Sequence, residues 1–282
     1  MTPSETFDMT DRVAMVSGAG RGMGRAMALA FAGAGADVVV VDRDEESNRQ
    51  TAADIEELGR RALPVSCDVS DCDAIEALYR TIDTEFGRID VAGNVAGEGV
   101  LAEPVEMTRE ELLEAFNGLV IGRFVSCREA GKRMLAAGRG SIINIGSLAS
   151  ISALGRRHLS YSMAMGAVVQ MTRELSTEWS GRGVRVNAIL PAQVLNPGLT
   201  RRREADPDLD RMFVGGIPAG RMGVPDDIRG LSLLLGSDAG SWITGALIPM
   251  DGGNLALNAG GPPGWLRAAS ADGFESGGGR RG

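Results

Sequence analysis

Residues 12–42 read RVAMVSGAGRGMGRAMALAFAGAGADVVVVD. A short apolar run (12–17) precedes a glycine-rich segment, an Ala/Met/Leu-rich stretch (23–34) and a β-branched run (37–42). This order predicts a strand, a tight turn, a helix and a second strand. Glycines let the backbone approach a pyrophosphate at the helix N-terminus, and a carboxylate ending the second strand can accept hydrogen bonds from ribose hydroxyls. The stretch therefore predicts a dinucleotide-binding unit.

The same alternation of strand and helix patterns continues almost to residue 250. Apolar strands that alternate with helices are typical of a parallel sheet covered on both faces. We therefore expect an α/β protein with a single-domain Rossmann fold, a doubly wound parallel sheet over residues 11–253, an N-terminal arm (1–10) and a glycine-rich C-terminal extension (254–282). The expected helices are 45–59, 74–86, 110–137, 160–180 and 226–235, and the further strands are 62–67, 89–92, 141–145, 184–190 and 246–250.

The bulk composition narrows the classes of partner. The formal net charge is −8 and the pI is about 4.9, which argues against nucleic acid or an anionic membrane as the main partner. Three cysteines without a CxxC pair and a single histidine predict no metal site. The acidic N-terminus lacks the apolar core of a signal peptide, and no apolar run approaches about 18 residues, so we expect a cytoplasmic protein. Cys67 and Cys127 are expected to be buried and inert.

Further motifs follow the glycine-rich turn in a fixed order. The spacing of Gly18, Gly22 and Gly24 is followed by an Asn-Val-Ala-Gly segment at 94–97, the strand leading to Ser147, and Tyr161. Cys-Asp-Val at 67–69, Arg-Val-Asn at 185–187, Ile-Thr-Gly at 243–245 and Asp-Gly-Gly at 251–253 complete the series. Over about residues 10–253 the sequence resembles the short-chain dehydrogenase/reductase family.

The resemblance implies a nicotinamide-dependent oxidoreductase that transfers hydride between the cofactor and an alcohol or carbonyl substrate, a small molecule. It implies catalytic roles for Ser147 and Tyr161, and a homodimer or homotetramer built through helices 110–137 and 160–180 and the last strand. The Asp42 carboxylate would repel a 2′-phosphate, so NAD is the preferred cofactor. NADP stays an alternative, because the guanidinium groups of Arg21 and Arg43 bind phosphate well. The cofactor-binding residues implied are Gly18, Arg21, Gly22, Met23, Gly24, Asp42, Arg43, Asp68, Val69, Asn94, Ala96, Gly97, Tyr161, Pro191, Val194 and Asn196.

Two departures from the family pattern affect the chemistry. Met165 stands where the family has a lysine one helical turn after Tyr161, and Leu119 stands where it has an asparagine. Asn117 is two residues, or about 200° of helix rotation, from that position. A tyrosine with the ordinary pKa of about 10 is only about 0.1% phenolate at pH 7, so losing the lysine should slow alcohol oxidation.

These departures leave alternatives open. The chain is either an oxidoreductase with an atypical active site, a non-catalytic NAD-binding homologue, or an enzyme that uses Ser147 and Tyr161 in a lyase or dehydratase reaction. Three residues are candidates for substrate contact: Arg156, His158 and Gln193. His158 lies close enough in sequence to Tyr161 to act as an acid or base, and Arg156 to clamp an anion; both can equally be solvated loop residues.

Overall fold

A computed structural model describes residues 2–97, 99–155, 157–205 and 208–257 of the chain. By its internal contacts the chain divides into two units. The larger unit comprises residues 1–191 and 225–250, and the smaller comprises 192–224 and 251–282. Each unit is considered by itself below.

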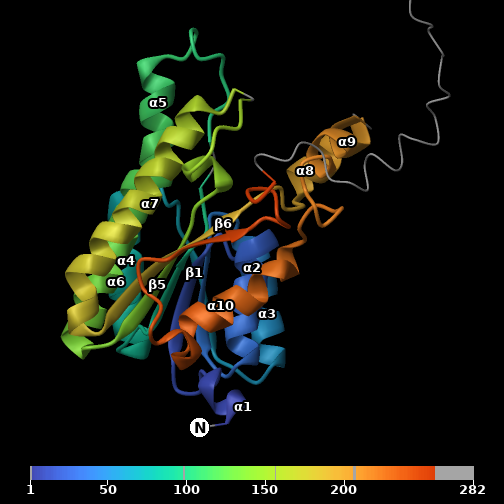
Figure 1. The fold of residues 1–282 in the computed structure, drawn as a ribbon. Coiled ribbons are helices and arrows are strands. Elements are labelled where there is room, and N and C mark those ends of the chain that lie inside the picture. Colours follow the sequence, from blue (N-terminus) through green and yellow to red (C-terminus); the bar gives the residue numbers. More distant parts are fainter. Residues whose placement is uncertain (1, 98, 156, 206–207, 258–282) are drawn as a thin grey trace, which may run out of the picture. The chain divides into compact units, whose positions relative to one another are not determined.

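The larger unit is built on a parallel sheet of seven strands in the order β3-β2-β1-β4-β5-β6-β7 (Figure 1). The order reverses between β1 and β4, as in a doubly wound sheet. The predicted fold class is therefore confirmed. The strands are β1 (Val13–Ser17), β2 (Asp37–Asp42), β3 (Ala62–Ser66), β4 (Val91–Asn94), β5 (Gly140–Ile145), β6 (Val184–Pro191) and β7 (Leu247–Met250).

Helices cover both faces of this sheet (Figure 1). Those on one face pack onto Val16, Val38 and Ile143, and those on the other onto Met15, Val39 and Ile142. Successive strand residues point to opposite faces, which explains the division. The first face carries α2 (Gly22–Gly33), α3 (Glu45–Glu57) and α10 (Arg229–Gly236), and the second carries α4 (Cys72–Phe86), α6 (Gly122–Ala137) and α7 (Leu159–Trp179).

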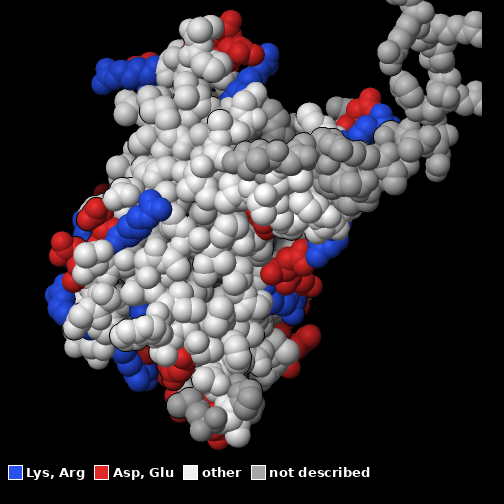
Figure 2. Space-filling model, viewed as in Figure 1, with Lys and Arg blue, Asp and Glu red and all other residues white. Residues whose placement is uncertain are grey.

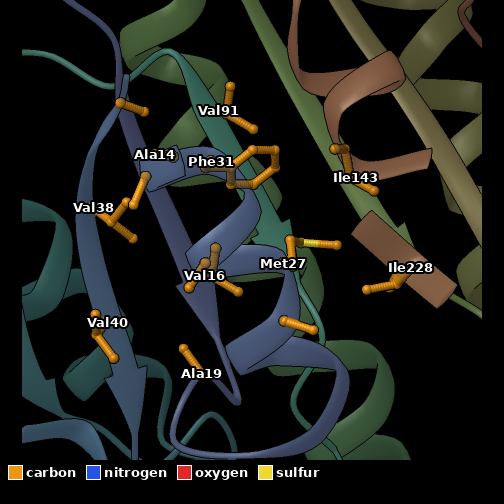
Figure 3. Packing of buried hydrophobic residues seen from close by; sticks show 14 of the residues in the cluster. Ala14, Val16, Ala19, Met27, Phe31, Val38, Val40, Val91, Ile143 and Ile228 are labelled. Atoms are coloured by element: carbon orange, nitrogen blue, oxygen red, sulfur yellow. The ribbon is translucent and has the colours of Figure 1, made fainter. Parts of the chain in front are cut away.

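Phe31 on α2 is the largest side chain in the first of these cores. Figure 3 shows its ring and the Met27 side chain in one cluster with Val16 of β1, Val91 of β4 and Ile143 of β5. Both residues are fully buried. A fully buried side chain of this size stabilises the fold by about 2 kcal/mol or more. This packing fixes α2, and with it the glycine-rich turn, on the carboxyl end of β1.

The predicted helix 110–137 is helical throughout but contains a π turn in its middle. The chain forms α5 (Arg109–Phe116), then a π-helical turn over Asn117–Ile121, then α6. A Cβ on Gly122 would lie 1.7 Å from the carbonyl oxygen of Val69, so the helix is pressed against the loop after β3. The π turn adds one residue to a helix that continues on both sides, so the helical pattern on its own did not reveal it.

Other differences are smaller. The strand expected at 89–92 lies at Val91–Asn94, because Asn94 is held in the sheet by buried polar partners. The segment at 226–235 begins with a 3₁₀ turn, Pro225–Ile228, before α10. The smaller unit contains two helices that the pattern did not predict, α8 (Pro197–Ala205) and α9 (Asp208–Val214). Their apolar spacing is too weak to stand out from a loop.

The N-terminal segment contains a short helix, α1 (Pro3–Thr6), capped by Thr2. Met9 is fully buried in the core beside α2, and its N–H donates to the carbonyl oxygen of Ala34 at 2.8 Å. Within the described residues, no helix has both the length and the apolar content that crossing a membrane requires. On the face seen in Figure 2, uncharged residues cover the middle, and most of the acidic and basic side chains lie toward the edges.

Candidate active site

The glycine-rich turn between β1 and α2 has no room for a larger residue at Gly18 or Gly24. Gly18 has φ +68°, and a Cβ there would lie 3.0 Å from the amide nitrogen of Ala96. A Cβ on Gly24 would lie 2.0 Å from the carbonyl oxygen of Gly18. The hydroxyl of Ser17 accepts hydrogen bonds from the N–H groups of Val95 and Ala96 at 3.1 and 3.3 Å. The turn is thereby joined to the loop that follows β4.

Helix α2 begins at Gly22 with no capping side chain. Arg21 occupies the N-cap position in an extended conformation and makes no side-chain cap hydrogen bond. Helices α3 and α4, in contrast, are capped by Asp44 and Asp71. The first-turn N–H groups of α2 are therefore left for another acceptor, and the positive end of the helix dipole favours an anion such as a pyrophosphate.

Asp42 at the end of β2 faces back toward the glycine-rich turn. Its carboxylate accepts hydrogen bonds from the N–H groups of Gly20 and Asp44, both at 3.2 Å. The side chain is half-buried, and Arg43 next to it is exposed. The carboxylate is thus held beside the glycine-rich turn, and its contact with a cofactor ribose stays a prediction.

The loop after β3 contributes Asp68 and Val69. The Asp68 carboxylate accepts from the backbone and hydroxyl of Ser70 at 2.8 and 2.7 Å, and these bonds lower the pKa of Asp68, with a smaller contribution from Arg43. Asp68 is exposed, whereas Val69 is half-buried and lines a small pocket with Ser17, Asn94, Ala96 and Arg123.

The side-chain amide of Asn94 belongs to a buried hydrogen-bond network. Its amide donates to Asn144 at 3.0 Å, and its oxygen accepts from Ser126 at 2.7 Å. Ser126 also contacts the hydroxyl of the buried Tyr79 at 3.0 Å. These partners leave the side chain directed into the protein, so any contact of this residue with a cofactor would come from its backbone.

Ser147 and Tyr161 come from adjacent elements. Ser147 follows β5 by two residues, is 8% exposed and caps the 3₁₀ turn Leu148–Ser150, accepting from the Ala149 N–H at 3.1 Å. Tyr161 is half-buried in the first turn of α7, which packs against that 3₁₀ turn. The Tyr161 ring also packs on Gly99, where a Cβ would lie 2.7 Å from Cδ2.

Next to Tyr161 lies a small apolar cluster. It contains Leu119, Ala164, Met165 and Val168, and Tyr161 packs against it. Leu119 is 1% exposed and Met165 is 2% exposed, whereas Asn117 is exposed. Leu119 and Met165, the two residues that depart from the family pattern, therefore lie in one cluster although they come from different helical segments. The side of Tyr161 that faces this cluster is apolar.

The residues predicted to contact substrate or the distal part of the cofactor are spread over both units. His158 is half-buried at the start of α7, with its ring edge-to-face to Tyr161 and the centroids 6.1 Å apart. Arg156 lies outside the described residues. In the smaller unit, Gln193 has a buried side-chain oxygen without a described partner, and Val194 pairs with Gly223.

Two further predicted cofactor residues have structural partners. Asn196 in the smaller unit accepts a hydrogen bond from the Leu199 N–H at 2.9 Å and so caps α8. Pro191 ends β6 in the larger unit. To bind the amide of a nicotinamide, the Asn196 side chain would have to break its hydrogen bond with the Leu199 N–H or share that oxygen with the cofactor.

Arg123 is a residue that the sequence interpretation missed. It is buried on α6, and its guanidinium donates to the carbonyl oxygens of Ile145 and Ala96, both at 2.9 Å. Ile145 ends β5 and Ala96 lies just after β4, so Arg123 sits under the carboxyl ends of these strands. The sequence feature that could have revealed it is a single arginine within the apolar run 119–127.

Cys67 and Cys127 are buried as expected, whereas Cys72 is half-buried. Burial raises the pKa of Cys67 to about 11, with smaller contributions from Asp68 and Asp71. Burial also raises the pKa of Cys127 to about 12. A thiol that stays protonated at neutral pH is a poor nucleophile, so neither residue is a candidate for covalent chemistry. The prediction that these two side chains are buried is confirmed.

Comparison with known proteins agrees with this architecture. Residues 18–254 match the family described as enoyl-(acyl carrier protein) reductase. The chain is 37% identical over 247 residues to a D-threitol dehydrogenase of Mycolicibacterium smegmatis, covering 88% of this chain and 94% of that protein. The chain belongs to the short-chain dehydrogenase/reductase family.

Solved structures of this family superpose closely on the chain. A gluconate 5-dehydrogenase from Burkholderia cenocepacia, in complex with NADP and tartrate, has a TM-score of 0.85 at 27% identity and covers 90% of this chain and 99% of its own. A 7α-hydroxysteroid dehydrogenase complexed with NADH and a 7-oxo bile acid has a TM-score of 0.85 at 28% identity, with coverages of 90% and 98%. Both nicotinamide cofactors therefore occur among short-chain dehydrogenase/reductase structures similar to this one.

Proposed function

We propose that this protein is an NAD(P)-dependent oxidoreductase that interconverts a secondary alcohol and a ketone on a small polyhydroxylated substrate. The observation that carries the proposal is the packing of Tyr161, the acid/base candidate, on the loop after β4 that also meets the glycine-rich turn through Ser17. The names of the relatives, a threitol and a gluconate dehydrogenase, support a polyol or sugar acid as substrate.

The described residues fit a dinucleotide. The Cβ positions of Gly18 and Gly24 are blocked by backbone, and the N-terminus of α2 lacks a side-chain cap. Gly18, Gly22, Gly24 and the first turn of α2 would hold the pyrophosphate, and Asp42 the adenosine ribose. When bound, the nicotinamide supplies or accepts the hydride.

The chain's own residues would then move the proton. In the direction of carbonyl reduction, the Tyr161 hydroxyl donates its proton to the substrate oxygen, and in alcohol oxidation the phenolate accepts it. The Ser147 hydroxyl keeps its own O–H free to donate, because its oxygen serves as acceptor toward Ala149. Ser147 would therefore hold the substrate oxygen in place for Tyr161.

The first test is turnover. Purified protein is incubated with NAD⁺ or NADP⁺ and a panel of polyols, aldonic acids and simple secondary alcohols, and reduced cofactor is followed by absorbance. Cofactor binding without hydride transfer to or from any compound of the panel, even at high pH, would favour a non-catalytic binding protein. The apolar cluster beside Tyr161 is the observation that supports this alternative. Product formation that continues without any cofactor would instead indicate a lyase or dehydratase.

We expect Asp42→Asn to shift cofactor preference toward NADP⁺. The substitution removes the negative charge that would repel a 2′-phosphate but keeps an oxygen for the Gly20 N–H. The ratio of kcat/KM for NAD⁺ to that for NADP⁺ should fall about tenfold or more. Asp44→Asn is the matched control, since asparagine also caps helices well and should leave the ratio unchanged. An unchanged ratio in Asp42→Asn would rule out a discriminating role for this carboxylate.

We also propose that the protein is a homo-oligomer that associates through α5, the π turn, α6 and α7. Large apolar side chains on these elements are exposed. A patch of apolar side chains is costly to leave in contact with water, and such patches often mark protein interfaces. Those involved are Leu113, Ile121, Phe124 and Met163, each between 43% and 49% exposed.

Phe124→Glu is expected to weaken this association at least a hundredfold, because it would bury an unpaired carboxylate at the contact. Size-exclusion chromatography with light scattering measures the mass across a dilution series. Leu58→Glu is the control, because Leu58 is similarly exposed but follows α3 at another place. A wild-type protein that is monomeric at all concentrations would contradict the proposal.

A further inference from the structure

We propose that Ser160 is a positioning residue that holds Tyr161 in place by fixing the loop at 99–103, on which the tyrosine ring packs. This inference rests on the proposed function, because the exact place of the Tyr161 hydroxyl matters for proton transfer to a substrate oxygen. Ser160 directly precedes Tyr161 in α7, but its hydroxyl bonds to the loop and not to the helix.

Two hydrogen bonds join the 99–103 loop to the start of α7. The Ser160 hydroxyl donates to the carbonyl oxygen of Val100 at 2.9 Å, and these two residues are 60 positions apart in the sequence. The N–H of Ala102 donates to the carbonyl oxygen of Arg157 at 3.3 Å. The loop is therefore attached to the residues on either side of the helix start.

The bond from Ser160 is the one that is protected from water. Ser160 is 0% exposed, whereas the side chains of Arg157 and Glu103, which form an ion pair between the same two segments, are 65% and 42% exposed. Water and salt screen an exposed ion pair, so it contributes little. Removing a buried hydroxyl costs more, because its acceptor loses a partner that water does not readily replace.

The start of α7 depends on contacts from outside the helix. His158 occupies the N-cap position and makes no side-chain cap hydrogen bond. The first turn of a helix, where Tyr161 lies, is held weakly when it has no cap. Arg157 has φ +61°, a strained value for a residue other than glycine, and such a conformation persists where surrounding contacts hold it. Ser160 supplies a buried contact of this kind.

The loop in turn limits where the Tyr161 ring can lie. A Cβ on Gly99 would lie 2.7 Å from Cδ2 and 2.9 Å from Cβ of Tyr161, so the Gly99 backbone lies directly against the ring. Gly99 and Val100 are neighbours in the loop, and Tyr161 and Ser160 are neighbours in the helix. The single hydrogen bond between Ser160 and Val100 therefore fixes how closely Gly99 meets the ring.

The first measurement is the rate of Ser160→Ala. We expect kcat to fall about tenfold and the dissociation constant of NADH to stay within about twofold, because the reacting hydroxyl moves while the glycine-rich turn does not. Ser176→Ala is the matched control. Ser176 lies on the same helix, is 6% exposed and donates to the carbonyl oxygen of Arg173 at 2.8 Å, so its loss removes a similar bond far from Tyr161 and should leave kcat unchanged.

A double-mutant cycle distinguishes positioning of Tyr161 from a general loss of structure. If Ser160 acts through Tyr161, adding Ser160→Ala to Tyr161→Phe should change the residual rate by less than about twofold. A further tenfold loss in the double variant would overturn the inference. If Ser160→Ala does not fold, Gly99→Ala replaces it in the cycle, because the added Cβ displaces the Tyr161 ring directly.

A spectroscopic measurement needs no turnover, because Tyr79 and Tyr161 are the two tyrosines of the chain. In protein labelled with ring-¹³C tyrosine, Tyr161→Phe assigns the two sets of nuclear magnetic resonance signals. Ser160→Ala should shift or broaden the Tyr161 signals and leave those of the fully buried Tyr79 unchanged. Altered Tyr161 signals together with an inactive wild type would sink the proposed function and retain the positioning role. Unchanged Tyr161 signals in Ser160→Ala would overturn the assignment of Ser160.

Discussion

Tyr161→Phe is expected to lower kcat/KM about a thousandfold. The substitution removes the hydroxyl proposed to exchange a proton with the substrate oxygen, at the start of the helix that packs against the turn capped by Ser147. General acid/base groups contribute about 10²–10⁴ in rate. NADH affinity should change little, because the ring still packs on Gly99 and on the apolar cluster. Initial rates and NADH fluorescence titration measure the two quantities on one preparation.

Tyr79→Phe is the matched control for this prediction. It removes the other tyrosine hydroxyl of the chain, which contacts Ser126 at 3.0 Å in the buried network, far along the chain from the site. The loss of one buried hydrogen bond should lower the free energy of unfolding by about 1 kcal/mol and leave kcat/KM unchanged. If Tyr161→Phe retains more than a tenth of wild-type kcat/KM, Tyr161 is not the acid/base.

Met165→Lys is expected to lower the free energy of unfolding by about 3 kcal/mol at pH 7. Met165 is 2% exposed among Leu119, Ala164 and Val168, so the ammonium would be buried without an acceptor. Met163→Lys is the control, because Met163 lies on the same helix but is 45% exposed and should tolerate a lysine within about 0.5 kcal/mol. Denaturant unfolding of both variants gives the free energies.

The pH dependence of the Met165→Lys effect has a definite sign. Burial depresses the lysine pKa in the folded state below its unfolded value of about 10.4, so the unfolded chain binds more protons at neutral pH. The deficit relative to wild type should therefore shrink as pH rises toward 10. Adding Leu119→Asn gives the ammonium a polar partner and should recover part of the loss. A variant as stable as wild type at pH 7 would show that the cluster is wetter or looser than its packing indicates.

The sequence by itself determined the parallel sheet, the glycine-rich turn after β1 and the place of Asp42 at the end of β2. The β-branched run ending in Asp42 is a strand because its pattern is local, and Gly18 and Gly24 fall where a tight turn must follow β1. These features depend on the period of apolar residues and on backbone sterics, both of which act between near neighbours.

Only the tertiary structure decided what surrounds Tyr161, the acid/base candidate. Leu119 and Met165 are 46 positions apart in the sequence, yet they share one cluster because a π turn sets how α5 and α6 approach α7. The Arg123 guanidinium donates to carbonyl oxygens at the carboxyl ends of two strands. The Asn94 side chain points inward because its hydrogen-bond partners lie on β5 and α6. Periodicity indicates which face of an element is buried, but which buried faces meet depends on packing between distant segments. That packing decides that apolar side chains surround one side of Tyr161.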